Sequence, residues 1–328
     1  MRINAYMKMV ARLHYRAVFS RLFISFLLFI FTVNTYAESD WLIKMVSATQ
    51  TLSYEGSFLY ARGGNIQLMK VRHRVGTSGR EERIWHINGL PMEIIRKNDI
   101  LTCYHPDGAS ADLEHTIPSG PYSQVFLHSG LSRLPGYQIE HLGKDRVSER
   151  VADMILLMPK EADRYSYRLW LDEETHILLR SEIVDINMDI LEQFQFVEID
   201  LDPIFHPDAF EPKLAGNSLS HVEKIPASLK GVLHITTDPD WHLNWLPDGF
   251  RLSHIESMTE RQSMLNYSDG VSSFSLFFEP VSLGMPEGQR SMGATWAITR
   301  HNYSYSMTFI GELPLASAER ILSAVKPN

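Results

Sequence analysis

The sequence has a single cysteine, Cys103, among its 328 residues. One cysteine cannot form an intramolecular disulfide, and its alternation with Leu101 on an expected strand favours a small buried side chain over a nucleophile. Known chemical motifs are also missing: there is no HExxH, CxxC, GxSxG, glycine-rich phosphate loop or EF-hand loop. We therefore predict no catalytic residue, no metal site and no cofactor, and expect a protein that is not an enzyme.

Long apolar runs are lacking except for one near the N-terminus. Residues 22–33 (LFISFLLFIFTV) are apolar, but 12 residues are too few to span a bilayer comfortably. They follow five Lys or Arg residues without an acid and precede Thr35-Tyr36-Ala37, a small-x-small site. This order is typical of a secretory signal peptide, so we expect residues 1–37 to be removed and the protein to reside in the bacterial periplasm. A retained anchor is the alternative.

The chain also lacks an excess of positive charge. It has 31 Lys and Arg against 39 Asp and Glu; without the five basic residues of segment 1–37, 26 basic and 39 acidic residues leave a formal charge of −13. This charge argues against nonspecific nucleic-acid binding, which needs a positive field. A local basic cluster is either a solvated strand face or an attraction for anionic lipid, and consists of Lys70, Arg72, Arg74, Arg80 and Arg83.

An alternating pattern dominates the rest of the sequence. After an expected helix at 39–52, alternation predicts strands at 54–61, 66–75, 82–87, 92–97, 100–105, 153–158, 164–171, 176–185 and 190–200. Short turns separate most of them, so neighbouring strands must be antiparallel. Residues 109–150 break the rhythm and are expected to form a helix-and-loop insertion, with a helix near 122–126, over one face of the sheet.

A polar, turn-rich segment at 213–231 has the composition of a linker. It divides the mature chain into an expected first domain at 38–212 and a smaller second domain at 232–328. In the second domain we expect strands at 253–259 and near 303–311, a turn in YSDG that opens VSSFSLFFEP, and a short helix after Pro314.

Aromatic residues recur on one face of the first domain. Phe58 and Tyr60 alternate on one expected strand, and Tyr165 and Tyr167 alternate on another. Such a face either packs as core or encloses an elongated apolar ligand, and Gly56 indicates a bend or a close approach. The residues that we assign to a lipid-binding cavity are Phe58, Tyr60, Tyr104, Tyr165, Tyr167 and Leu169.

The second domain offers its own aromatic candidates. Trp245 and Phe250 flank the turn in WLPDGF, where they either plug the turn or form an interface. The predicted partner-binding residues are Trp245, Phe250, Tyr267 and Phe274.

Several stretches occur in an order that resembles the RseB/MucB family of periplasmic sigma-E regulators. They are LSYEGSFLY, NGLPMEIIRKNDILTCYHPDG, RYSYRLWLDEETHILLRSEIVD, LEQFQFVEID, WLPDGF, YSDGVSSFSLFFEP and IGELP. The resemblance covers nearly the whole mature chain. It implies an α+β protein: an N-terminal open antiparallel β-barrel with helices on its concave face, similar to periplasmic lipoprotein carriers, and a smaller C-terminal α/β domain.

The resemblance also implies a regulatory function. Such proteins bind the periplasmic domain of a membrane anti-sigma factor, shield it from the site-1 protease, and are released by lipid or lipopolysaccharide. The expected partners are that domain and a lipid or lipopolysaccharide, with no nucleic acid, and assembly into a homo-oligomer stays open. The alternative is a periplasmic lipid or lipoprotein carrier, which would share the cavity but would not need the second domain.

Overall fold

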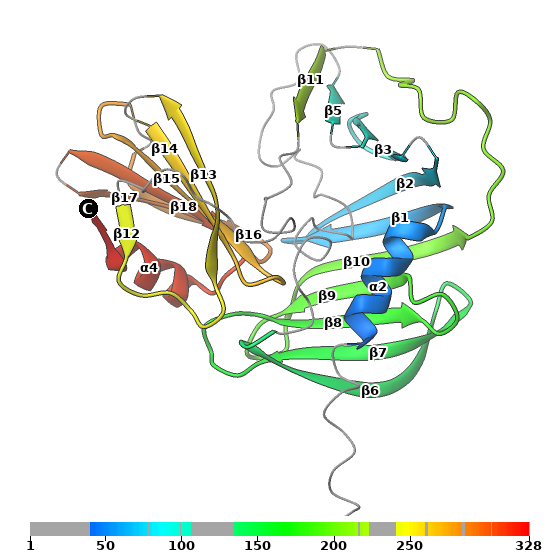
Figure 1. Ribbon diagram of the computed structural model, residues 1–328, viewed down its shortest axis with the longest axis horizontal. Coiled ribbons are helices and arrows are strands. Elements are labelled where there is room, and N and C mark those ends of the chain that lie inside the picture. Colours follow the sequence, from blue (N-terminus) through cyan, green and yellow to red (C-terminus); the bar gives the residue numbers. More distant parts are fainter. Residues whose placement is uncertain are drawn as a thin grey trace, which may run out of the picture. The chain divides into compact units, whose positions relative to one another are not determined.

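The computed structural model is built mainly from two antiparallel sheets (Figure 1). It describes residues 40–77, 79–98, 100–105, 134–215, 217–222, 241–259, 262–283, 286–302 and 304–327. The expected signal peptide and the expected helix near 122–126 lie outside these residues. Apart from the first two residues of α2, everything below belongs to one compact unit, Leu42–Asn328. No helix among the described residues is long and apolar enough to cross a membrane.

The larger sheet contains eleven strands in the order β11-β5-β4-β3-β2-β1-β10-β9-β8-β7-β6. Its elements are α2 (Asp40–Thr51), β1 (Tyr54–Arg62), β2 (Asn65–Gly76), β3 (Gly79–His86), β4 (Glu93–Lys97), β5 (Ile100–His105), β6 (Tyr137–Val147), β7 (Arg150–Pro159), β8 (Ser166–Asp172), β9 (Leu178–Val184), β10 (Ile190–Asp200) and β11 (Asn217–Val222). The end strands β11 and β6 are not paired with each other, so this sheet is not closed. The expected open antiparallel architecture is therefore confirmed.

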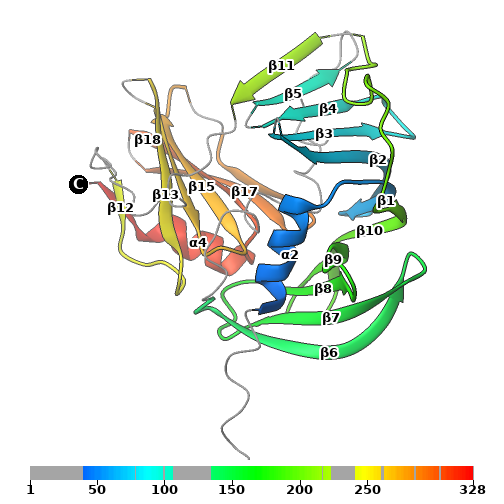
Figure 2. The same cartoon turned by 45° about the vertical axis from the view of Figure 1, so that its right-hand side comes forward.

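Helix α2 lies across the concave side of this sheet (Figure 2). Its apolar stripe is buried, as are Tyr54 and Phe58 on β1; the buried helix residues are Leu42, Met45, Ala48 and Thr49. The spacing of these residues matches one face of a helix, which is why the helical pattern could be read from the sequence. The expected helix at 39–52 is confirmed.

In the larger sheet, two strands lie where the sequence predicted none. Strand β6 occupies part of the expected insertion at 109–150, and it pairs with β7 along its length. Most of its side chains are exposed, so it lacks the alternating apolar pattern that a half-buried strand shows. Strand β11 occupies part of the expected linker at 213–231 and extends the sheet beside β5. The expectation of helix and loop was therefore wrong for residues 137–147, residues 109–133 of that segment lie outside the described part of the chain, and the linker and the domain boundaries stay predictions.

The smaller sheet contains six strands in the order β13-β14-β15-β18-β17-β16. The C-terminal elements are β12 (Trp241–Leu243), β13 (Arg251–Thr259), β14 (Gln262–Ser268), β15 (Ser273–Pro280), β16 (Gly288–Met292), β17 (Thr295–Asn302), β18 (Tyr305–Gly311), α4 (Leu315–Ala324) and β19 (Val325–Pro327). Helix α4 packs against β17 and β18. The helix after Pro314 and the strand near 303–311 are confirmed, as α4 and β18.

Phenylalanine rings form the centre of the second core. Phe274 and Phe309 stack with their ring centroids 5.2 Å apart, and Phe278 stacks on Trp241 at 4.7 Å.

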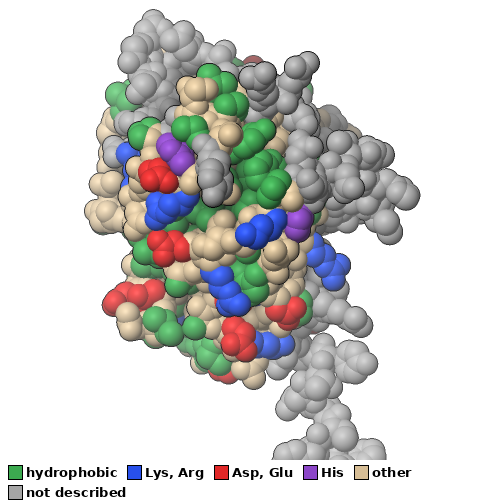
Figure 3. Space-filling model, turned by 90° about the vertical axis from the view of Figure 1, so that its left-hand side faces the viewer, with side chains coloured by type: hydrophobic (Ala, Val, Ile, Leu, Met, Phe, Trp, Pro, Cys, Tyr) green, Lys and Arg blue, Asp and Glu red, His purple; other side chains and the backbone are tan. Residues whose placement is uncertain are grey.

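On the face drawn in Figure 3, Lys and Arg side chains alternate with Asp and Glu, and hydrophobic side chains reach the surface between them. No charge of one sign gathers on the described part of this face.

Candidate functional site

The aromatic row of β1 is core at its first end. Phe58 is 1% exposed, and its ring centroid lies 5.1 Å from that of Phe194. A Cβ added to Gly56 would lie 2.6 Å from the carbonyl oxygen of Glu198 and 2.9 Å from the ring of Phe196. Both distances are too short for a real carbon contact, so Gly56 makes room for that ring. At this end the glycine marks a close approach and the aromatic side chains fill the space themselves.

The other end of the β1 row contacts the six-stranded sheet. The hydroxyl of Tyr60 donates a hydrogen bond to the carboxylate of Glu192 on β10, which also accepts the backbone N–H of Ala294 at 2.9 Å. A Cβ at Gly293, which has φ +58°, would lie 2.5 Å from Cγ of Arg62. The turn between β16 and β17 therefore fits closely against β1 and β10. Burial, followed by the charge of Glu192, raises the pKa of Tyr60 well above its usual value.

Two more tyrosines, Tyr165 just before β8 and Tyr167 on β8, belong to the same contact. The indole N–H of Trp296 donates a hydrogen bond to the hydroxyl oxygen of Tyr165, and Tyr167 lies against Ser272. The hydroxyl of Ser272 in turn donates to the backbone carbonyl of Glu312 at 2.8 Å. Burial, followed by the charges of Glu312 and Asp269, raises the pKa of Tyr167. These hydroxyl groups face polar atoms of the second sheet in this structure.

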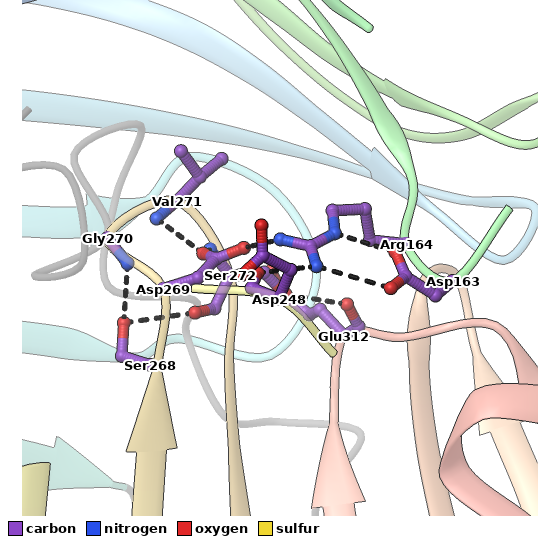
Figure 4. Close-up of polar contacts among 9 residues, drawn as sticks. All are labelled: Asp163, Arg164, Asp248, Ser268, Asp269, Gly270, Val271, Ser272 and Glu312. Atoms are coloured by element: carbon purple, nitrogen blue, oxygen red, sulfur yellow. Dashed lines mark hydrogen bonds and ion pairs between the residues drawn. The ribbon is translucent and has the colours of Figure 1, made fainter. Parts of the chain in front are cut away.

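Arg164, which precedes β8, forms a polar link between the two sheets (Figure 4). Its guanidinium lies 2.6 Å from the carboxylate of Asp269 and donates to the backbone carbonyl of Asp248 at 2.8 Å and to Asp163 at 2.8 Å. The turn that carries Asp269 is itself fixed, because its carboxylate accepts the backbone N–H groups of residues 271 and 272. Burial opposes the charge of Arg164, but the hydrogen bond to Asp163 and the charge of Asp269 raise its pKa.

Aromatic rings enclose this guanidinium. It lies 5.4 Å from the ring centroid of Tyr137 and 5.3 Å from that of Phe250, distances typical of cation–π contacts. Glycine is required beside it, because a Cβ at Gly136 would lie 2.0 Å from a guanidinium nitrogen. The ion pair is therefore held in a dry site, where removal of one partner costs more than at the surface.

The six predicted cavity residues do not gather in one site. Tyr104 on β5 is separated from β1 by the strands β4, β3 and β2, whereas β8 lies beyond β10 and β9 on the other side. Tyr104 is half-buried, and Leu169 is fully buried. Of the six, Tyr60, Tyr165 and Tyr167 share one environment, the contact with the second sheet. Whether any of the six binds lipid stays a prediction.

Three of the four predicted partner-binding side chains lie in the core of the second sheet. Phe250 is 6%, Tyr267 5% and Phe274 1% exposed. Trp245 is half-buried, and the guanidinium of Arg320 lies 3.8 Å from its ring centroid. In this structure these positions pack within their own domain, and Phe250 also contacts the guanidinium of Arg164; their role in partner binding stays a prediction.

Three of the five side chains in the basic cluster of the first domain are paired with acids. Arg72 contacts Glu55 at 3.0 Å, and Arg74 and Arg83 form ion pairs with Glu81 and Glu93. Paired cations attract an anionic lipid less than free cations do, because the neighbouring carboxylates oppose the field. These pairs favour the interpretation as a strand face over a lipid-attracting patch.

The described residues contain no group of three or more His, Cys, Asp or Glu side chains that could hold a metal ion. Cys103 is half-buried, and burial raises the pKa of its thiol. A nucleophilic cysteine needs the opposite shift, because the thiolate is the reactive form.

A groove of about 320 Å³ on the outer face of β1 is polar, and is lined by Glu55, Gly56, Ser57, Lys70, Glu198, Ile199 and Asp200.

Two domain families match this chain. They follow one another along the sequence in the same order as the two sheets. The MucB/RseB N-terminal domain matches residues 37–214, and the MucB/RseB C-terminal domain matches residues 236–326. The chain belongs to the MucB/RseB family. The resemblance seen in the ordered sequence motifs is therefore confirmed.

Curated members of the MucB/RseB family cover most of the chain. The sigma-E factor regulatory protein RseB of Haemophilus influenzae is 29% identical over 293 residues, which are 86% of this chain and 89% of that protein. The sigma factor AlgU regulatory protein MucB of Pseudomonas aeruginosa is 29% identical over 303 residues, 88% of this chain and 91% of that protein. The relatives are thus named as regulators of sigma factors.

Solved MucB structures share the fold. A complex of Pseudomonas aeruginosa MucA and MucB matches with a TM-score of 0.68 at 25% identity, covering 89% of this chain and 99% of that chain. A structure of MucB in complex with MucA(peri) matches with a TM-score of 0.66 at the same identity and coverage. The likeness spans both sheets, since it covers most of the described residues.

The polar residues of the contact between the sheets escaped the sequence interpretation. Tyr60, Tyr165 and Tyr167 were predicted as ligand-binding or core residues, but their neighbours Glu192 and Arg164 were not singled out. Arg164 lies at the start of RYSYRLW, one of the stretches that carry the family resemblance. No local pattern separates a buried arginine from an exposed one, so only this position within a family stretch could have drawn attention to it.

Proposed function

We propose that this protein is a periplasmic regulator of envelope stress that binds the periplasmic domain of a membrane anti-sigma factor. Bound to that domain, it shields the domain from the site-1 protease and so keeps the sigma factor inactive. The protein acts by binding and not by catalysis. The observation that carries the proposal is the match over 89% of the chain to MucB in its complex with MucA.

Protection follows from mass action if the regulator binds the uncleaved segment. The protease acts on the free fraction of the anti-sigma domain, and a binding partner lowers that fraction according to its concentration relative to Kd. At about 100 times Kd, cleavage is expected to slow by about two orders of magnitude.

Lipid or lipopolysaccharide is proposed to release the regulator. The contacts of Tyr60, Tyr165 and Tyr167 with the second sheet support this step. A lipid that packs on these rings has to replace those contacts, so it binds better when the two sheets separate. A ligand that prefers one arrangement of the sheets shifts the equilibrium toward it, and the arrangement that holds the anti-sigma domain becomes less populated.

The test uses mature protein, residues 38–328, with the periplasmic domain of its cognate anti-sigma factor. Cleavage by the site-1 protease is followed with increasing protein, and then with lipopolysaccharide or phosphatidylcholine vesicles added. We expect protection that saturates and that lipopolysaccharide reverses. Unchanged cleavage at saturating protein would refute the proposal. Transfer of lipid between vesicles, without protection, would support the carrier alternative instead.

A further inference from the structure

The contact between the two sheets has two ends, which lie on different strands. At the first end, the turn Gly293-Ala294 between β16 and β17 lies against β1 and β10 of the larger sheet. At the second end, Arg164 contacts Asp248 and Asp269 in two other turns of the smaller sheet, next to β13 and β15. Strand β9 lies between β10 and β8, so the two ends are separated by two strand spacings, about 10 Å.

The first end is held by close packing and by a backbone hydrogen bond. The N–H of Ala294 donates to the carboxylate of Glu192 at 2.9 Å, and a Cβ added to Gly63 would lie 3.3 Å from the backbone nitrogen of Gly293. Glu192 is 5% exposed, and it forms no ion pair with any residue that the structure describes. Its other hydrogen bond comes from Tyr60 of the same sheet, so that bond is kept when the sheets part. Parting returns the carboxylate to water, which offsets much of the lost bond to Ala294.

The second end has several contacts on one charged group. The guanidinium of Arg164 lies 2.6 Å from the carboxylate of Asp269, and the two side chains are 1% and 2% exposed. The same guanidinium donates to the carbonyl of Asp248 at 2.8 Å and lies 5.3 Å from the ring centroid of Phe250. Hydrogen bonds between charged groups are stronger than neutral ones. All three contacts cross between the sheets and would have to break together, so this end parts less easily than the first.

We propose that the two sheets open about a hinge at Arg164, and that the turn Gly293-Ala294 is a latch that is released first. Opening at the latch uncovers Tyr60 and the adjoining end of β1. The pair of Arg164 and Asp269 meanwhile keeps the smaller sheet attached. The movement is therefore a rotation of one sheet against the other and not a complete separation.

The experiment measures distances at both ends of the contact and so does not depend on the proposed function. Mature protein with Cys103→Ser carries two nitroxide spin labels on exposed positions, one on each sheet. The latch pair is Ile66→Cys with Arg290→Cys, and the hinge pair is Ala162→Cys with Arg251→Cys. Pulsed electron paramagnetic resonance gives the distance distribution of each pair, and we expect both to be narrow in the parent protein.

Two substitutions release the latch in different ways. Gly293→Ala places a Cβ 2.5 Å from Cγ of Arg62 and 2.7 Å from Cγ of Glu192, so the turn cannot stay in contact with β1 and β10. Glu192→Ala leaves the turn unchanged and removes the acceptor of the Ala294 N–H; it provides the test if Gly293→Ala fails to fold. In both variants the latch pair should lengthen while the hinge pair keeps its distance. The ratio of open to closed molecules should rise about tenfold or more, as expected for the loss of a hydrogen bond to a charged group.

Gly64→Ala is the matched control. Gly64 has φ +85°, so alanine strains its turn as it does at Gly293, but nothing lies within 4 Å of the added Cβ. Both distances should remain those of the parent, whereas Arg164→Met should lengthen the hinge pair as well. The proposal is overturned if the latch pair does not lengthen in the release variants, if both pairs lengthen equally in them, or if Gly64→Ala gives the same change.

Discussion

Replacing Arg164 with methionine keeps a long apolar stem but removes the cation that links the two sheets. The side chains of Arg164 and Asp269 are 1% and 2% exposed, and their closest atoms are 2.6 Å apart. Without the guanidinium, Asp269 keeps a buried carboxylate without its counter-ion, and the carbonyl of Asp248 loses a donor. Breaking a buried pair in this way costs about 3–5 kcal/mol of the free energy of unfolding.

Urea denaturation of Arg164→Met, Asp269→Asn and the double variant forms a complete thermodynamic cycle. Arg164→Met should lose about 3–5 kcal/mol, because it leaves the buried Asp269 without a counter-ion, whereas Asp269→Asn should lose less, because Arg164 keeps its ion pair with Asp163. The double variant removes both charges of the buried pair. Its loss in the free energy of unfolding should therefore be smaller than the sum of the two single losses, by about 1–3 kcal/mol. Because the pair links two sheets, the unfolding curve of Arg164→Met should also separate into two transitions.

A surface pair provides the matched control. Lys97 and Glu211 lie 3.0 Å apart, but their side chains are 45% and 57% exposed. Lys97→Met should cost no more than about 1 kcal/mol, since water screens both charges. The reasoning about burial is refuted if Arg164→Met costs as little as Lys97→Met, or if the cycle shows no coupling between Arg164 and Asp269.

Three other predictions concern residues of the first sheet. Gly56→Ala should destabilise by about 1–3 kcal/mol, because its Cβ would overlap the ring of Phe196, whereas Gly76→Ala, with nothing within 4 Å, should be nearly neutral; thermal denaturation compares them. Phe58→Ala should cost about 3–5 kcal/mol, and a smaller loss in urea would contradict its place in the core. Cys103 should react with iodoacetamide only above the pH at which an ordinary thiol does, because burial raises its pKa, and a profile shifted to lower pH would contradict this.

The strands that could be predicted from the sequence are those with one buried face. On β1 and β10, buried and less buried side chains alternate, so hydrophobic residues recur with a period of two. Strand β6 is an end strand of the sheet with few buried side chains, and no such period marks it. Strand β11 is the end strand on the other side of the sheet. It is defined by its pairing with β5 and not by a hydrophobic pattern.

The contact between the sheets was harder to predict, for two physical reasons. The sequence does not show whether an arginine or a glutamate is buried, and only the residue that it pairs with in the folded chain distinguishes the two cases. The partners are far apart along the chain: Arg164 and Asp269 are separated by 105 residues, and Tyr60 and Glu192 by 132. Local patterns therefore identified the tyrosines of this contact but not the charges that hold them.

The two ends of the β1 row differ in what a ligand would have to displace. At Phe58 a ligand would have to break a packed core of aromatic rings, whereas at Tyr60 it would compete with Glu192 and the second sheet. The tyrosine end is therefore the half that a ligand could reach without disrupting the core around Phe58. If a ligand binds only when the sheets are apart, its apparent Kd is the intrinsic value divided by the open fraction. The ligand must then open the contact by the same factor, because coupling between two equilibria is reciprocal. Any change that loosens the contact, such as Arg164→Met, should therefore tighten ligand binding at Tyr60 and leave the core around Phe58 intact.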